Sequence, residues 1–231
     1  MSRIILKISG EALSNSDELV NKEKLELVLN TIKLLRSKGH LVAIIIGGGN
    51  IFRGRSNPNM DPANSTAIGV SGSIINSLYL KDYLEQNGNK VALSTPFELN
   101  SLIEKYSDTE LLDKYNNGEI IIFGGGVGKI GYSTDSGIIL ANDKLHCDLL
   151  IKMTNVDGVY NDDPNKNPNA IKYDFITFEK VLEDGLKIMD EQAILECKNK
   201  NIKILVIDFY KYTELEDFFE GRKVGTLIGE K

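Results

Sequence analysis

The sequence predicts a three-layer αβα sandwich in which helices cover both faces of a mainly parallel central sheet. Short apolar runs rich in β-branched residues alternate along the chain with longer segments of helical periodicity, which is the order expected of βαβ units. Runs such as residues 42–46 and 119–123 are apolar at nearly every position rather than at every second one. That pattern is typical of strands that are buried on both faces.

The expected elements follow one another from the first residues onward. Strands are predicted where short β-rich runs occur, at residues 3–9, 41–46, 90–95, 119–123, 149–153 and 202–208. Helices are predicted where apolar positions recur every three or four residues, at 22–39, 66–86, from about 133 onward and at about 191–200. Two further short helices are expected between the third and fourth strands. The polar run at residues 55–65, rich in Asn, Pro and Ser, is expected to be a surface loop.

Length and composition restrict the function classes. With 231 residues, 42% of them hydrophobic, the chain can bury a substantial core. The formal charge is −6 and no Lys/Arg block is present, so a nucleic-acid partner is not expected. No apolar run approaches the roughly 18 residues of a membrane span, and the first residues enter a strand pattern without a signal-peptide region. We therefore expect a cytoplasmic protein with no membrane partner.

The cysteines and histidines carry no recognisable site. Cys147 and Cys197 lie in apolar-patterned segments without metal-ligand spacing, so we expect buried free thiols and no protein-held metal. His40 and His146 lie next to strand starts, and no partner motif accompanies either of them. We expect neither to be catalytic.

Four loops that follow predicted strands carry the residues suited to a binding site, because ligands of parallel sheets bind beyond the carboxyl ends of the strands. They read KISGEAL, GGGNIFRG, GGGVGKIGYSTDS and MTNVDGVYNDDPNKNP. Lys7 can reach an anion to which Ser9 and Gly10 offer backbone N–H groups. The glycine triplets let the backbone approach a ligand closely, and Arg53 follows one of them at a distance that suits the same anion. The pattern favours several phosphates held by amides, Lys7 and Arg53.

Residues 121–137 contain two near-matches to phosphate-binding motifs. The P-loop pattern is not matched, because its first glycine and its final hydroxyl are missing. The dinucleotide pattern G-x-G-x-x-G fits through Gly126, Gly128 and Gly131, with Asp157 as the following acidic residue. However, such a fingerprint usually opens its domain, whereas two glycine loops precede it here, and Asp157 stands against a turn-forming glycine. A nicotinamide or flavin protein is therefore the weaker alternative to another nucleotide enzyme.

Several motifs together resemble those of a known family. LKISGEAL, IGGGNIFRG, STDS, VDGVYNDDPNKNP, LKIMD and GTLI occur in the order and approximate spacing of the bacterial uridylate (UMP) kinases, of the amino acid kinase superfamily. The match runs from about Arg3 to Ile228. VDGVY with the following DP is shared across the superfamily, whereas KISGEAL, GGGNIFRG and KIMD together are close to diagnostic of the uridylate branch. The resemblance implies one amino acid kinase domain, residues 1–231, with an acceptor-binding part at about 1–145 and an ATP-binding part at about 146–231.

The resemblance also implies a reaction and a set of site residues. The γ-phosphoryl group of ATP would pass to UMP, giving UDP for pyrimidine nucleotide biosynthesis, with Mg²⁺ bound to the ATP. The implied catalytic residues are Lys7, Arg53 and Asp190, the last as the aspartate that orients the catalytic lysine. The implied ATP contacts are Lys7, Ser9, Gly10, Gly49, Arg53, Thr154, Tyr160 and Asp163, of which the last three match the family's adenine and ribose site. The implied UMP contacts are Gly48, Thr66, Val127, Gly128, Lys129, Thr134 and Asp135. A homohexamer, with GTP and UTP as effectors, is implied as well.

The residue types suit phosphoryl transfer to a phosphate. A phosphomonoester has its second pKa near 6, so the attacking oxygen is already largely anionic at neutral pH and needs no general base. Catalysis then consists mostly of alignment and neutralisation of the phosphoryl charge. Lysines, an arginine, backbone amides and Mg²⁺ are sufficient for that.

The departures from the family pattern fall mainly on the acceptor side. Thr66 stands where the family carries an aspartate that contacts UMP, and the middle loop differs from the usual TGNPFFTTD at Val127, Lys129, Ile130 and Gly131. On the donor side a second phosphate-contacting lysine is not assigned by the motifs, and Lys152 is the candidate. Three alternatives stay open: a diverged uridylate kinase, a related kinase for another small phosphate, carboxylate or carbamate, and a non-catalytic nucleotide-binding paralogue.

Overall fold

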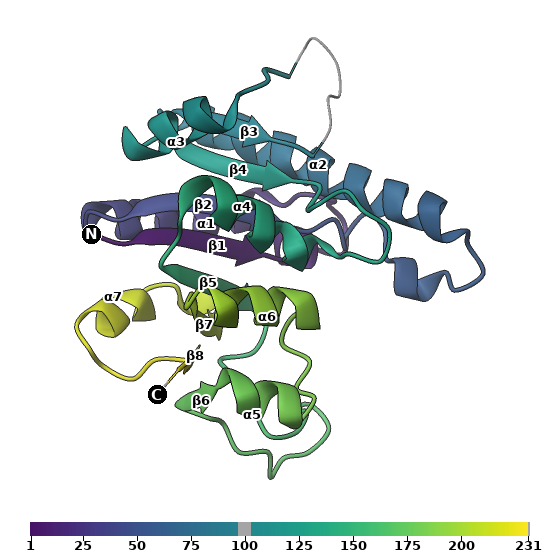
Figure 1. Cartoon of the computed structure of the whole chain (residues 1–231), viewed down its shortest axis with the longest axis vertical. Helices are drawn as coiled ribbons and strands as arrows, with labels where there is room; N and C mark the ends of the chain where they lie inside the picture. Colours follow the sequence, from purple (N-terminus) through teal and green to yellow (C-terminus); the bar gives the residue numbers. More distant parts are fainter. Residues whose placement is uncertain (97–102, 231) are drawn as a thin grey trace.

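The computed structural model describes residues 1–96 and 103–230, and in this part of the chain eight strands form one sheet (Figure 1). The strands are β1 (Arg3–Ile8), β2 (Leu41–Ile46), β3 (Val91–Ser94), β4 (Ile120–Gly124), β5 (Leu149–Thr154), β6 (Phe175–Thr177), β7 (Lys203–Asp208) and β8 (Thr226–Gly229). Their order across the sheet is β3-β4-β2-β1-β5-β7-β8-β6. Neighbours run parallel except β7 and β8, which are antiparallel. The predicted mainly parallel α/β sheet is confirmed.

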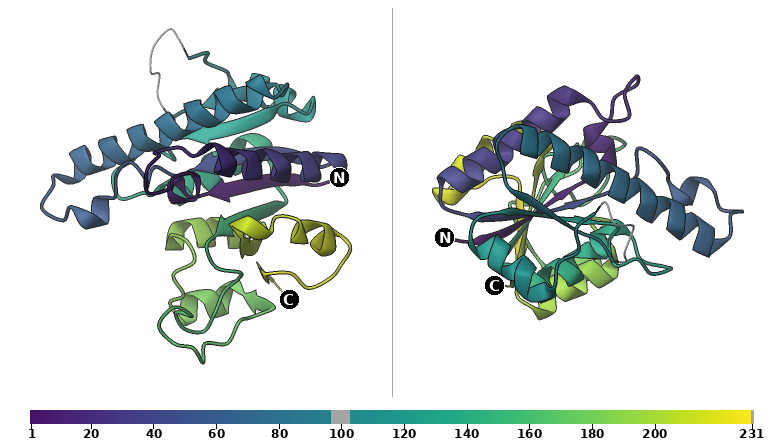
Figure 2. Two further views of the ribbon diagram at one scale, coloured as in Figure 1. Left: turned by 180° about the vertical axis from the view of Figure 1, so that it is seen from behind. Right: turned by 90° about the horizontal axis from the view of Figure 1, so that it is seen from above.

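Helices cover both faces of this sheet. They are α1 (Lys22–Ser37), α2 (Pro62–Gln86), α3 (Asp108–Asn116), α4 (Gly137–Leu145), α5 (Phe178–Glu183), α6 (Glu191–Asn199) and α7 (Glu214–Phe219), with short 3₁₀ turns η1 (Gly10–Leu13), η2 (Gly54–Ser56), η3 (Thr134–Ser136) and η4 (Phe209–Lys211). The right-hand view of Figure 2 shows α1, α2 and α7 on one face and α3, α4 and α6 on the other. The three predicted layers are therefore present.

The two faces of β1 show why the strand sequences are apolar throughout. Ile4, Leu6 and Ile8 belong to the core beneath α1 and α2, whereas Ile5 belongs to the core beneath α4 and α6. All four side chains are fully buried, and each stabilises the fold by about 1.5–3 kcal/mol relative to an exposed position. Lys7 points to the same face as Ile5, because side chains alternate along a strand.

Some boundaries differ from those predicted. Helix α2 begins at Pro62 rather than near residue 66, because Asp61 caps it by accepting hydrogen bonds from the backbone N–H groups of Ala63 and Asn64, both at 3.0 Å. The polar run at 55–65 is therefore a loop only in part. Of the two short helices expected before β4, the structure has α3, while residues 97–102 lie outside the described part.

The fold brings the glycine loops together at one edge. Strands β4, β2, β1 and β5 are consecutive and parallel, so the loops that leave their carboxyl ends lie side by side. The left-hand view of Figure 2 shows the amino-terminal half of α2 projecting beyond this edge. The expected binding edge is thus bordered by one long helix.

Candidate functional site

Two lysines and one aspartate form a buried charged cluster at the carboxyl ends of β1 and β5. Lys7 and Lys152 are register partners on these neighbouring parallel strands, so their side chains leave the same face of the sheet. Lys7 Nζ lies 2.7 Å from Asp135 Oδ1, and Lys152 Nζ lies 3.7 Å from Asp135 Oδ2. Lys152 also donates a hydrogen bond to the carbonyl of Ile188. Two cations therefore share one carboxylate, which leaves positive charge for an incoming anion.

The pKa values reflect this arrangement. Burial raises the pKa of Asp135, but the charges and hydrogen bonds of Lys7 and Lys152 together outweigh burial and bring the pKa down to about 2. The pKa of Lys152 is lowered, first by burial and then by repulsion from Lys7, although Asp135 opposes both. A phosphate beside these lysines would relieve their mutual repulsion.

Asp190 holds the turn that carries Asp135. Its Oδ2 accepts hydrogen bonds from the backbone N–H of Ser133 at 3.2 Å and from Ser136 Oγ at 3.3 Å. Asp190 immediately precedes α6 and η3 precedes α4, so these bonds join two helix starts across the site. The resemblance implied that Asp190 orients the catalytic lysine. In the structure the carboxylate paired with Lys7 is Asp135, and Asp190 supports the Asp135 turn.

Two buried polar side chains of α2 fix the glycine loops. Ser73 Oγ donates to the carbonyl of Ile46 at 2.6 Å and accepts from the backbone N–H of Gly125 at 2.8 Å. It thereby joins the loop after β2 to the loop after β4. Asn76 Nδ2 donates to the carbonyl of Gly47 at 2.7 Å. A Cβ at Gly48 would lie 2.6 Å from the backbone nitrogen of Ser73, so α2 packs against the loop more closely than any side chain permits.

A cavity of ≈ 590 Å³, here called the α2 cavity, opens between these loops and the first turns of α2. Arg53 and Glu11 form an ion pair in its wall. Of the residues implied for UMP, Gly48, Thr66 and Thr134 line it. Gly49 and Arg53, implied for ATP, line the same cavity. The structure therefore groups the second glycine loop and its arginine with the predicted acceptor residues.

Two further cavities continue from the α2 cavity toward β5. The α6 cavity, ≈ 580 Å³, is lined by Asp135, Lys152 and Asp190 among others, and Asp190 also lines the α2 cavity. The β5 cavity, ≈ 660 Å³, shares Lys152 with the α6 cavity. The three residues predicted for adenosine, Thr154, Tyr160 and Asp163, all line the β5 cavity. The charged cluster thus borders the cavity that lies between the other two.

The remaining predicted residues lie around these cavities. Ser9 Oγ accepts from the backbone N–H of Ala12 at 3.2 Å and caps η1, and a Cβ at Gly10 would lie 2.6 Å from the carbonyl of Gly47. These two residues support the loop packing. The middle-loop residues implied for UMP are partly buried or exposed: Val127 and Gly128 are half-buried, and Lys129 is exposed.

The alternative sites considered from the sequence find no support in the described residues. Tyr160 and Lys172 both donate hydrogen bonds to the Asp157 carboxylate, at 2.6 Å and 3.0 Å, so Asp157 stabilises the turn of its own loop.

Within residues 1–96 and 103–230, no group of three His, Cys, Asp or Glu side chains could hold a metal ion, and no helix is long and apolar enough to cross a membrane. Cys147 and Cys197 are buried free thiols, as predicted, and burial raises the pKa of each to about 12.

Ser73, Asn76 and the pairing of Asp135 with two lysines were not found from the sequence. The signal for the first two was present, because small polar residues recur through the apolar pattern of 70–77. A buried helix face with such residues indicates hydrogen bonds to neighbouring backbone. The pairing of Asp135 has no local signal, since its partners lie on two other elements.

Comparison with known proteins agrees with this geometry. A model of the amino acid kinase family matches residues 2–208. A uridylate kinase from Fervidobacterium nodosum is 40% identical over 232 residues, covering 99% of this chain and 98% of that protein. One from Bacteroides thetaiotaomicron is 36% identical over 229 residues, covering 98% and 97%. The crystal structure of UMP kinase from Bacillus anthracis superposes with a TM-score of 0.92 at 32% identity, covering 99% and 96%. The chain belongs to the amino acid kinase family, in its uridylate kinase branch.

Proposed function

We propose that this protein transfers the γ-phosphoryl group of ATP to UMP, giving UDP. The observation that carries the proposal is the cluster of Lys7, Lys152 and Asp135, which borders a cavity between two others. One neighbouring cavity has the glycine loops and Arg53 that suit a phosphate acceptor, and the other has the residues matched to adenosine. The full-length relatives named uridylate kinase supply the identity of the acceptor.

The residues would act by positioning and charge neutralisation. The acceptor phosphate would lie against the backbone of Gly48 and Gly49 with Arg53 beside it, and its anionic oxygen would attack without a base. Lys7 would stabilise the charge that develops on the transferring group. Asp135 would hold Lys7 in place, and Asp190 would hold the Asp135 turn. Mg²⁺ would arrive with ATP, as is usual where phosphates supply most of its ligands.

The chain would divide its substrates between two parts. Residues of about 1–145 would bind the acceptor and those of about 146–231 the ATP, in one domain whose sheet is continuous through the pairing of β1 with β5. This division is supported by the β5 cavity, whose lining residues all lie between Lys152 and Val206. Pyrimidine nucleotide biosynthesis in the cytoplasm, with GTP and UTP as effectors, belongs to the same proposal through the family.

A homohexamer is the assembly we propose from the resemblance. Helix α2 is its first candidate contact, because residues 62–80 contain no charged side chain and Ile68, Ile75, Leu78 and Tyr79 on it are 39–53% exposed. An uncharged, exposed helix face of this kind suits a second copy of the same chain. Sedimentation velocity should give an oligomer, and Leu78→Glu should reduce its mass.

A coupled assay of ADP release over an acceptor panel tests the function. With Mg²⁺-ATP, UMP should be phosphorylated well ahead of CMP, AMP and dTMP. Lys7→Ala should remove most of the activity while the far-UV CD spectrum stays unchanged. Strong turnover of another acceptor without turnover of UMP would show that this is a related kinase of different specificity. No turnover of any acceptor would favour the non-catalytic paralogue.

A further inference from the structure

Three lysines to which the motifs assign no role line the cavities on the donor side, Lys152, Lys166 and Lys187. Lys152 and Lys187 both line the α6 cavity and the β5 cavity. Lys187 is exposed and lies in the segment between α5 and α6, next to Ile188. If the β5 cavity holds adenosine and Lys7 lies at the transferred phosphoryl group, the polyphosphate chain must cross the border between these cavities. Lys187 stands at that border.

The ion pairs distinguish Lys187 from the other lysines nearby. Lys7 and Lys152 share Asp135, and Lys166, which also lines the β5 cavity, lies 3.5 Å from a carboxylate oxygen of Asp163. Among the described residues, no carboxylate forms a salt bridge with Lys187. Its ammonium group can therefore bind an anion without first losing a partner.

Lys152 is restrained where Lys187 is not. Its side chain is mostly buried, its Nζ donates to the carbonyl of Ile188, and Asp135 lies within 3.7 Å. The bond to Ile188 also fixes the backbone directly after Lys187. Lys152 thus anchors the segment on which the flexible, exposed side chain of Lys187 is mounted.

We propose that Lys187 binds the β- and γ-phosphates of the nucleoside triphosphate donor from the solvent side of the site. The inference rests on the proposed function, which places a triphosphate donor in the β5 and α6 cavities. A lysine suits this role because it is a compact charge on a long stem and needs no fixed geometry to reach a phosphate chain. Lys152 is then chiefly the residue that positions this segment.

Nucleotide binding tests the inference without requiring turnover. We would titrate wild type, Lys187→Ala, Lys187→Arg and the matched control Lys200→Ala with Mg²⁺-ATP, Mg²⁺-ADP and AMP by isothermal calorimetry, because Lys200 is an exposed lysine that lines none of the three cavities. Lys187→Ala should weaken ATP binding about 5- to 10-fold, as expected for a partly solvated charge-assisted contact. It should weaken AMP binding less than twofold and leave the melting temperature unchanged. Lys187→Arg should restore most of the ATP affinity, and Lys200→Ala should bind ATP nearly as wild type does.

Other outcomes would overturn the inference. ATP affinity unchanged in Lys187→Ala, an equal loss for AMP and ATP, or no binding of ATP by wild type would each contradict it. The acceptor is tested separately: if wild type binds ATP with this dependence on Lys187 but does not phosphorylate UMP, the proposed function fails and the inference holds. If UMP is phosphorylated and Lys187→Ala binds and uses ATP normally, the inference alone fails.

Discussion

Replacing Ser73 by alanine should loosen both glycine loops at once, because the Ser73 hydroxyl serves two backbone groups. It donates to the carbonyl of Ile46 at 2.6 Å and accepts from the N–H of Gly125 at 2.8 Å, and Ser73 is fully buried. The variant leaves both groups without a partner, and an unsatisfied buried group costs about 1–3 kcal/mol. The free energy of unfolding should therefore fall by about 2–6 kcal/mol, which lowers the melting temperature by roughly 4–24 °C in a chain of this length.

The same change should weaken catalysis beyond its effect on stability. The loop after β2 carries Gly48 and Gly49, so at a temperature where the variant stays folded we expect a higher KM for UMP and a nearly unchanged KM for ATP. Differential scanning calorimetry and initial rates measure the two effects. Ser71→Ala is the matched control, because Ser71 is exposed on the same helix and, among the described residues, its hydroxyl donates only to the carbonyl of Ala67 one turn earlier. If Ser73→Ala melts and reacts as Ser71→Ala does, the loops do not depend on this hydroxyl.

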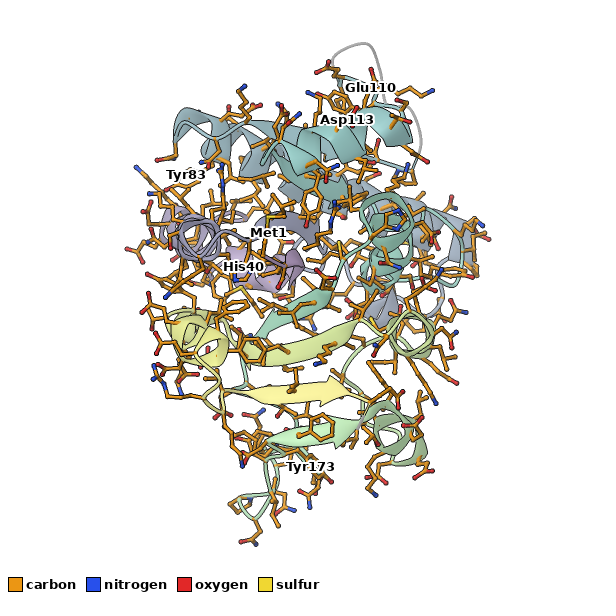
Figure 3. The ribbon with its side chains drawn as sticks, turned by 60° about the vertical axis from the view of Figure 1, so that its left-hand side comes forward. Met1, His40, Tyr83, Glu110, Asp113 and Tyr173 are labelled. Atoms are coloured by element: carbon orange, nitrogen blue, oxygen red, sulfur yellow. The ribbon has the colours of Figure 1, made fainter. Side chains whose placement is uncertain are left out.

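Three further perturbations test separate parts of the structure. Glu11→Ala should raise the KM for UMP several-fold, because Arg53 loses the carboxylate that holds it. Glu11→Gln keeps a hydrogen-bond acceptor and should bring the KM part of the way back. A lower KM in Glu11→Ala would show instead that Glu11 competes with the substrate for Arg53. The carboxyl pKa of Asp135 is about 2 in the fold against 3.8 ordinarily, so its contribution to stability is complete above pH 3.8 and is lost as the pH falls toward 2. Urea unfolding at several pH values should show that the difference in free energy of unfolding between wild type and Asp135→Asn becomes smaller over that range. A difference that stays constant would contradict the pairing of Asp135 with the two lysines. His40 accepts a hydrogen bond from the backbone N–H of Ser2, and Figure 3 shows it beside Met1. Burial and then the nearby amino terminus lower the His40 pKa from 6.5, so the protein should lose stability as the pH drops below 6.5. Thermal melts from pH 8 to 5 measure this loss, and the melting temperature of His40→Gln should fall less over the same range.

The sequence was informative where local chemistry decides the structure. Strands such as β2 are apolar throughout because both faces are buried, and the glycine triplets mark places where backbone must pass close to backbone. Lys7 could be recognised because a lysine one residue before the end of a buried strand is rare unless it reaches an anion or solvent. These signals depend on few residues. They predicted the sheet, which the structure confirms, and they are the basis on which we propose its binding edge and the role of Lys7.

Residues whose interaction partners lie far away in the sequence could be identified only from the structure. Asp135 follows a loop whose sequence differs from the family pattern, and its ion pairs are with Lys7 and Lys152, which are distant in sequence and adjacent only in the folded sheet. The short strands β6 and β8 were missed for the same reason, since each has only three or four residues and is defined by pairing. Tertiary contacts, rather than local preference, determine such elements.

The departures in the middle loop become less important for the acceptor once their positions are known. Lys129 and Ile130 are exposed, whereas Thr66 and Gly131 line the α2 cavity. Gly131 also has φ +85°, a conformation that an aromatic side chain at this position would adopt only with strain. Lys129 does not line the α2 cavity, so it can change the electrostatic potential around the acceptor without contacting the acceptor. We therefore expect the change at Thr66, where the resemblance implies a carboxylate that contacts UMP, to bear most directly on nucleoside recognition, because a hydroxyl lines the cavity there instead.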